Sequence, residues 1–185
     1  MKPGNLRQLC QHLSDKRLMK ICIVGAGAIG GFSGALFARA GHEVSLVARG
    51  AHLEVLRSRG LTLEFEGGRE TFRLPAAADP AAFGAQDLVL VALKAYSIAP
   101  MLERIRPLVG GHTVVVPAIN GLPWWYFYRE GGRFDGKPIA CLDPEGRMFA
   151  ALDPACLIGC AASPARCRRP DSRCRLRGAY ATRSG

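Results

Sequence analysis

Apolar runs alternate with helix-like stretches along most of the chain. Residues 21–24 are apolar at every position and end at a glycine, which is typical of a strand buried on both faces. Residues 29–40 carry apolar side chains at helical spacing, and Gly41 then provides a C-terminal stop. The same alternation continues downstream, and it predicts helices at 51–59 and 98–108 and strands at 44–48, 87–93 and 113–119.

A shorter pattern interrupts this alternation. Residues 61–65 and 70–74 alternate between apolar and polar positions on either side of Gly67-Gly68, which predicts a hairpin-like excursion. Elsewhere, apolar strands separated by helices predict a parallel sheet that is covered by helices on both faces. Because such crossovers are right-handed, the sequence predicts an α/β fold with a Rossmann-type doubly wound parallel sheet.

The net charge of +10 changes this picture little, because it is concentrated at the two ends of the chain. Residues 1–18 carry a net +3 and residues 161–185 a net +6, which leaves +1 for residues 19–160. A nearly neutral folded part lacks the basic face that nucleic-acid binding needs, so we expect no nucleic-acid partner. The seven cysteines include no CxxC pair, and we expect no metal site.

Nothing in the sequence indicates a membrane or a secretory route. No stretch approaches the roughly 18 consecutive apolar residues of a spanning helix. The first 20 residues lack the apolar core of a secretory signal, and the odd number of cysteines fits reduced thiols. We therefore expect a cytoplasmic protein without a membrane partner, and the sequence leaves its oligomeric state open.

The pattern divides the chain into three parts. We expect residues 1–18 to be a loosely attached extension, because their periodicity is too weak for a stable isolated helix, and residues 19–160 to form one domain. Residues 161–185 contain seven arginines but no lysine, valine, isoleucine or phenylalanine, so they have little to bury. This composition predicts a basic disordered tail, produced by a shifted reading frame in a GC-rich gene. A natural basic tail that binds RNA or an acidic partner is the alternative.

A glycine-rich motif joins the first predicted strand to the first predicted helix. A GxGxxG pattern alone is weak, but this position is typical of a turn that binds the pyrophosphate of a dinucleotide; a turn without a ligand is the alternative. Gly25 allows the tight turn, Gly27 lets the backbone approach the anion, and Gly30 lets the helix pack closely on the strand. The expected cofactor-binding residues of this motif are Gly25, Ala26, Gly27, Ala28, Ile29 and Gly30.

Arg49 follows the second predicted strand, where NAD-binding domains place an acidic residue for the ribose 2′-hydroxyl. A carboxylate there would repel a 2′-phosphate, whereas a guanidinium binds it through two parallel hydrogen bonds. The sequence therefore predicts NADP(H) as the cofactor. A solvated surface arginine is the alternative interpretation of the same residue.

Two further polar residues stand at predicted strand ends, Lys94 after residues 88–93 and Asn120 after residues 114–119. Ligands of open parallel sheets bind at the carboxyl ends of the strands, so both residues are candidates, with solvated strand ends as the alternative. The aromatic run 124–128 is interpreted as core or domain packing rather than a nucleic-acid platform, because no basic groove accompanies it.

Taken in order, these motifs resemble those of the ketopantoate reductase (2-dehydropantoate 2-reductase) family. The resemblance covers about residues 19–160, and its Leu-Lys-Ala and Asn-Gly motifs are more specific than the glycine pattern. The segments that carry it are residues 19–31 and 41–44, Arg49, Leu93 to Tyr96, and Asn120-Gly121.

The resemblance implies an NADPH-dependent oxidoreductase that reduces 2-dehydropantoate, a small-molecule 2-oxo acid, to (R)-pantoate in pantothenate biosynthesis. It implies that residues 25–30 hold the pyrophosphate and that Arg49 and Lys94 hold the region of the adenosine 2′-phosphate. Asn120 would lie near the nicotinamide and the substrate, as both a cofactor-binding and a substrate-binding residue.

Family members carry a general-acid lysine in a helical C-terminal domain. In this chain no lysine follows Lys137, so no catalytic residue is assigned and the helical domain is expected to be missing. Two alternatives stay open: another NADP-dependent 2-oxo acid reductase or opine-type dehydrogenase with the same first domain, and a non-catalytic NADP-binding fragment.

Overall fold

The computed structural model describes residues 18–65, 68–160 and 173–175. The proposed extension, apart from Leu18, and most of the proposed basic tail lie outside the described residues. Among the described helices, none has both the length and the apolar character needed to cross a membrane.

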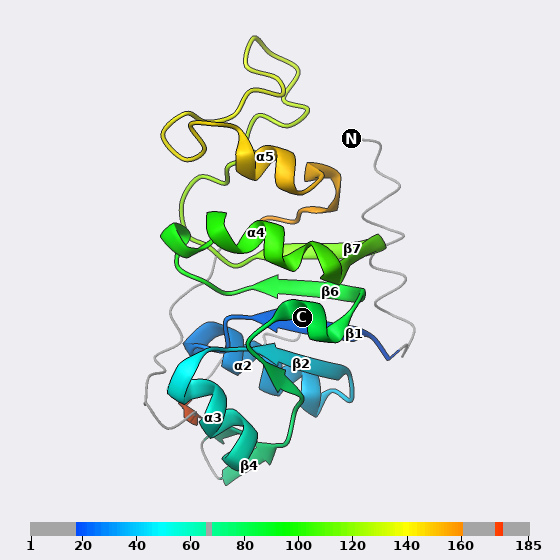
Figure 1. Ribbon diagram of the computed structural model, residues 1–185, viewed down its shortest axis with the longest axis vertical. Coiled ribbons are helices and arrows are strands. Elements are labelled where there is room, and N and C mark those ends of the chain that lie inside the picture. Colours follow the sequence, from blue (N-terminus) through cyan, green and yellow to red (C-terminus); the bar gives the residue numbers. More distant parts are fainter. Residues whose placement is uncertain (1–17, 66–67, 161–172, 176–185) are drawn as a thin grey trace, which may run out of the picture.

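The central sheet has five parallel strands in the order β5-β2-β1-β6-β7, and Figure 1 shows β7, β6, β1 and β2 side by side. The order runs outward from β1 in both directions, which is the doubly wound Rossmann arrangement that the sequence predicted. Isolated parallel bridges from Leu157 and Cys160 continue the sheet beyond β7. The strands are β1 Lys20–Val24, β2 Glu43–Val47, β5 Ala76–Ala77, β6 Gln86–Val91 and β7 Val109–Pro117.

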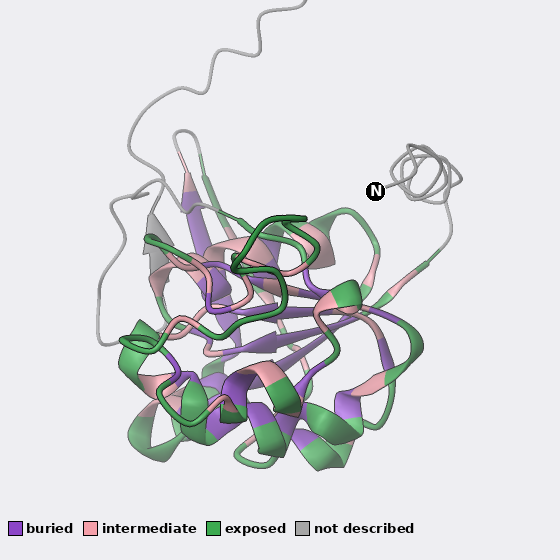
Figure 2. Cartoon of the chain, turned by 90° about the horizontal axis from the view of Figure 1, so that it is seen from above, coloured by how far each residue is buried: buried purple, intermediate pink, exposed green. Residues whose placement is uncertain are grey.

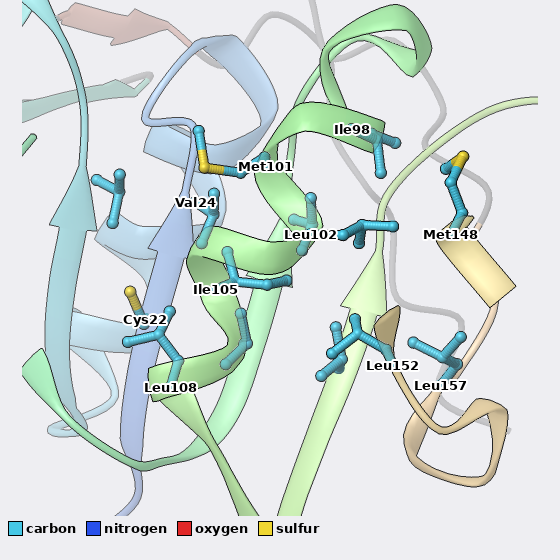
Figure 3. Packing of buried hydrophobic residues seen from close by; sticks show 14 of the residues in the cluster. Cys22, Val24, Ile98, Met101, Leu102, Ile105, Leu108, Met148, Leu152 and Leu157 are labelled. Carbon is cyan, nitrogen blue, oxygen red and sulfur yellow. The ribbon is translucent and has the colours of Figure 1, made fainter. Parts of the chain in front are cut away.

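Two apolar clusters cover the two faces of this sheet, because successive side chains of a strand point to opposite faces. Ile21 and Ile23 of β1 pack with helices α2 (Ala28–Arg39) and α3 (Gly50–Arg59). Cys22 and Val24 face the other way, toward α4 (Ala99–Ile105) and α5 (Arg147–Ala151), as Figure 3 shows. Figure 2 shows the buried strands at the centre and the exposed sides of the helices outside them.

One predicted helix is interrupted. Residues 98–108 were expected to form a single helix, whereas the structure has α4 between the 3-10 turns η2 (Ala95–Ser97) and η3 (Arg106–Leu108). Pro107 has no backbone N–H and cannot donate the next hydrogen bond of an α-helix, so α4 ends at Ile105, although Arg106 still has α-helical dihedral angles. Pro100 lies in the first turn of α4, where its missing N–H costs nothing.

The hairpin is confirmed, as the antiparallel pair β3 (Leu61–Phe65) and β4 (Gly68–Phe72). The second strand lies two residues earlier than predicted. A short strand β8 (Arg173–Arg175) pairs in parallel with β3, although the sequence predicted no regular element after Cys160. The sequence also missed β5 and α5, together with the turns η1 (Pro80–Phe83) and η4 (Pro154–Cys156).

Candidate dinucleotide-binding site

The register of the sheet brings four strand ends to one edge. Val24 of β1 is paired with Val47 of β2 on one side and with Val91 of β6 on the other. Val91 is in turn paired with Pro117 of β7. The residues that follow these four positions therefore emerge at the same carboxyl edge, where open parallel sheets bind ligands.

The first of these segments is a turn that only glycine can form. Gly25 has a φ of +98°, and a Cβ there would lie 2.8 Å from the carbonyl oxygen of Ala92 and 2.6 Å from Leu93 Cδ2. Its backbone N–H donates to the carbonyl oxygen of Val47 at 3.0 Å, and the N–H of Ala26 donates to the same oxygen at 3.3 Å. The turn thus passes directly from β1 into helix α2, held against both neighbouring strands.

The two other glycines of the motif have opposite surroundings. Gly27 is exposed and precedes α2, and a Cβ there would meet no heavy atom within 4 Å. A Cβ at Gly30 would overlap the carbonyl oxygen of Gly25 and would lie 2.9 Å from Ile23 Cγ2 and 3.0 Å from Ala92 Cβ. The start of α2 is therefore pressed against β1, while the space in front of its N-terminus is open to a ligand.

The three other residues of the motif, Ala26, Ala28 and Ile29, are buried or half-buried beside the turn. Ala26 is buried among the side chains of the α2 face of the sheet, and Ile29 packs against the same cluster. Ala28 begins helix α2 and is half-buried. Because a helix N-terminus carries a partial positive charge, this geometry suits the pyrophosphate of a dinucleotide.

Arg49 lies two residues beyond the end of β2 and immediately precedes α3. Its side chain is exposed, and it forms no ion pair with any residue that the structure describes. His52 follows in the first turn of α3, where burial lowers the pKa of its imidazole below the ordinary value. A free guanidinium at this edge is available for a phosphate.

Lys94 lies three residues beyond β6 and is exposed, likewise without an ion pair among the described residues. Its carbonyl oxygen accepts a hydrogen bond of 2.8 Å from the backbone N–H of Ser97, which closes the turn η2. The N–H of Ala92 donates to the carbonyl oxygen of Val24 at 2.9 Å and continues the ladder toward Lys94. The segment from β6 to η2 is therefore fixed beside the glycine turn.

Asn120 lies three residues beyond β7 and is exposed, just before Gly121, whose φ is +112°. The N–H of Ala118 donates to the carbonyl oxygen of Val91 at 2.9 Å, so the approach to Asn120 is held to the sheet. Strand-end asparagines often bond their own backbone, but within the described part of the chain the Asn120 amide has no such partner. Its donor and acceptor atoms are available to a ligand.

The aromatic run takes no part in this edge. Trp124 is 2% exposed inside the α4 cluster, and its ring meets that of Trp125 edge to face at 4.3 Å. The packing interpretation of these residues is confirmed for Trp124. Cys22 is equally buried, as the sequence indicated, and burial raises the pKa of its thiol to about 11, which makes it unreactive.

The edge thus combines a glycine turn, the N-terminus of α2, two exposed cations and an exposed amide. A convergence of positive groups in front of an open helix N-terminus recognises phosphate. Sequence reasoning missed the contribution of Ala92, whose side chain packs against the glycine motif, because a small residue after an apolar strand has no distinctive pattern. Fold and site together define a dinucleotide-binding domain of the Rossmann type.

Comparison with known proteins places this domain more closely. The family described as ketopantoate reductase PanE/ApbA matches residues 21–123. A curated 2-dehydropantoate 2-reductase from Mesorhizobium japonicum is 47% identical over 148 residues, which cover 80% of this chain and 45% of that protein. The chain therefore belongs to the ketopantoate reductase family, whose members are dinucleotide-binding oxidoreductases.

Solved structures agree with this assignment. The crystal structure of a proposed ketopantoate reductase from Ralstonia solanacearum MolK2 is 40% identical, with a TM-score of 0.81, and covers 88% of this chain and 50% of that one. A 2-dehydropantoate 2-reductase from Geobacter metallireducens GS-15 is 29% identical, with a TM-score of 0.67, over 86% of this chain and 46% of the other. The chain thus spans about half the length of the relatives that it matches.

Proposed function

We propose that this chain binds NADP(H) and forms the cofactor-binding half of an NADPH-dependent 2-dehydropantoate 2-reductase. The observation that carries the cofactor choice is Arg49, an exposed guanidinium without a partner in the described structure, at the strand end where NAD-specific domains place an acid. Family membership and the names of the relatives support 2-dehydropantoate as the substrate and (R)-pantoate as the product.

Each residue at the edge takes one part in this proposal. The backbone of residues 25–30 holds the pyrophosphate at the start of α2, and Arg49 with Lys94 holds the region of the adenosine 2′-phosphate. Asn120 orients the nicotinamide end and the keto acid through its amide. NADPH, when bound, supplies the hydride that reduces the ketone.

A proton must also reach the alkoxide oxygen of the product, and no residue of this chain is assigned to donate it. The sequence has no lysine after Lys137, and the chain spans about half of its relatives. We also propose that residues 19–160 form the NADP-binding domain. A cytoplasmic location fits a soluble biosynthetic role.

The test is a pair of binding titrations on the full 185-residue chain. NADPH is expected to bind at least about tenfold more tightly than NADH, which corresponds to about 1.4 kcal/mol. Arg49→Ala should narrow this gap, chiefly by weakening NADPH. Arg59→Ala, which removes an exposed arginine from the far end of the same helix, is the matched control and should leave both affinities unchanged.

Equal affinities of the unmutated chain for the two cofactors would overturn the NADP(H) assignment. Turnover with 2-dehydropantoate and with other 2-oxo acids then tests the substrate. Reduction of a different 2-oxo acid in preference would identify another reductase or an opine-type dehydrogenase. Because no residue of this chain is assigned to donate the proton, tight NADPH binding without turnover of any of them would show that the chain by itself is a non-catalytic cofactor-binding fragment.

A further inference from the structure

Tyr96 is the most exposed of the large apolar and aromatic side chains in the described part of the chain, at 84%. Aromatic rings usually bury a large area, so this ring leaves most of its hydrophobic surface in water. Single exposed rings are common on protein surfaces, and exposure alone assigns no role. What distinguishes Tyr96 is its position at the edge that holds the dinucleotide site.

The turn that carries Tyr96 is anchored. The N–H of Ser97 donates to the carbonyl oxygen of Lys94 at 2.8 Å, and the N–H of Ile98 donates to that of Ala95 at 3.1 Å. Ile98 is buried in the cluster beneath α4, close to Leu102, as Figure 3 shows. The exposed ring is thus attached to backbone that two hydrogen bonds and a buried neighbour hold in place.

The same segment lies directly against the glycine turn. A Cβ at Gly25 would lie 2.6 Å from Leu93 Cδ2, and one at Gly30 would lie 3.0 Å from Ala92 Cβ. Residues 92–96 therefore run from the pyrophosphate turn to the exposed ring without an intervening element. Lys94, on the path between them, is exposed at the same edge.

We infer that Tyr96 packs its ring against the adenine base of the bound dinucleotide. This inference rests on the proposed function, in which Lys94 of the same turn holds the adenosine 2′-phosphate region. An aromatic face stacks on any base, because every base offers a π-face, and since the backbone of the turn is already held, only the side chain of Tyr96 has to be ordered on binding. Tyr96 thus contributes affinity for the adenosine half, whereas Arg49 contributes the choice between NADPH and NADH.

The experiment compares Tyr96→Ala, Tyr96→Phe and Tyr126→Ala with the unmutated chain. Tyr126 is an exposed tyrosine outside the site and serves as the control. The probes are NADPH, NADH and adenosine 2′,5′-bisphosphate, which lacks the nicotinamide. Tyr96→Ala is expected to weaken all three by at least about fivefold and to leave the NADPH to NADH ratio unchanged. Tyr96→Phe and Tyr126→Ala should bind all three within about twofold of the unmutated chain.

Three other results would overturn the inference. If Tyr96→Ala binds adenosine 2′,5′-bisphosphate as tightly as the unmutated chain does, the ring does not contact the adenine and the inference is wrong. A loss confined to NADPH and NADH would place the ring at the nicotinamide instead. If the unmutated chain binds none of the probes, the proposed function fails and the inference fails with it. Because the side chain is exposed, an unchanged melting temperature is expected to show that Tyr96→Ala is folded.

Discussion

Alanine substitutions at Gly30 and Gly27, the two motif glycines at the start of α2, should separate effects on folding from effects on cofactor binding. In Gly30→Ala the new methyl would overlap the carbonyl oxygen of Gly25 and approach Ile23 Cγ2 to 2.9 Å. The obstacle includes backbone, so the whole turn must move, and such overpacking costs about 1–3 kcal/mol. Alanine recovers up to about 1 kcal/mol of helix propensity, and less in a first turn. We therefore expect a net loss of about 1–2 kcal/mol, together with weaker cofactor binding.

Gly34→Ala is the matched control for this loss. Its Cβ would lie 3.3 Å from Ile23 Cγ1 and from Leu46 Cδ2, two side-chain atoms that can shift by a few tenths of an ångström. The gain in helix propensity should offset that shift, so stability is expected to stay within about 0.5 kcal/mol. The difference between the two variants then isolates the backbone contact at Gly30.

Gly27→Ala should show the reverse behaviour. Its Cβ meets nothing within 4 Å, so unfolding in urea should change by less than about 1 kcal/mol, but the methyl would occupy the space through which the pyrophosphate approaches. Urea unfolding followed by tryptophan fluorescence, with NADPH titration of each variant, measures both effects. A Gly30→Ala protein as stable as the unmutated chain, or a Gly27→Ala protein that binds NADPH normally, would refute this account of the motif.

Two further predictions concern buried groups outside the site. The thiol of Cys22 has a pKa of about 11, above its unfolded value, so the unfolded state loses its proton first as the pH rises. The free energy of unfolding should fall between about pH 9 and 11, by up to about 1.4 kcal/mol per pH unit. Cys22→Ala should remove this part of the pH dependence. The same pH dependence in both proteins would contradict the prediction. The Asp143 carboxylate is buried and accepts hydrogen bonds from the N–H groups of Met148 at 3.1 Å and Phe149 at 2.9 Å. Asp143→Ala should therefore cost about 1–3 kcal/mol in urea unfolding, because it leaves these donors unpaired, and an unchanged midpoint would show that water replaces them.

Local patterns predicted much of the sheet and the class of site. β1, β2, β6 and the second half of β7 are short, largely apolar runs, so each was recognisable without its neighbours, whereas the start of β7 at residues 109–112 was not. The glycine motif was specific for the same reason, since strand, turn and helix follow one another within a few residues. The charge of Arg49, two residues beyond β2, could also be read directly from the sequence.

Elements that depend on distant partners were not predictable in this way. β5 has only two residues and exists because it pairs with the end of β2, and α5 is held by the buried carboxylate of Asp143. The predicted helix at 98–108 ended early because Pro107 outweighs an apolar pattern that continues past it. In each case a contact with a distant residue, or a proline, decides where the element lies. The local pattern of apolar residues does not reveal how strong that contact or constraint is.

The sequence by itself determined which residue types stand at the strand ends, and hence the chemistry that a ligand would meet. Only the tertiary structure decided that they meet at all. The pairing of Val24 with Val47 and Val91 aligns the strand ends, and this register arises from hydrogen bonds between strands that are 20 or more residues apart. The packing of Ala92 against Gly25 and Gly30 likewise depends on the close approach of β6 to the turn, a distance that no sequence pattern encodes.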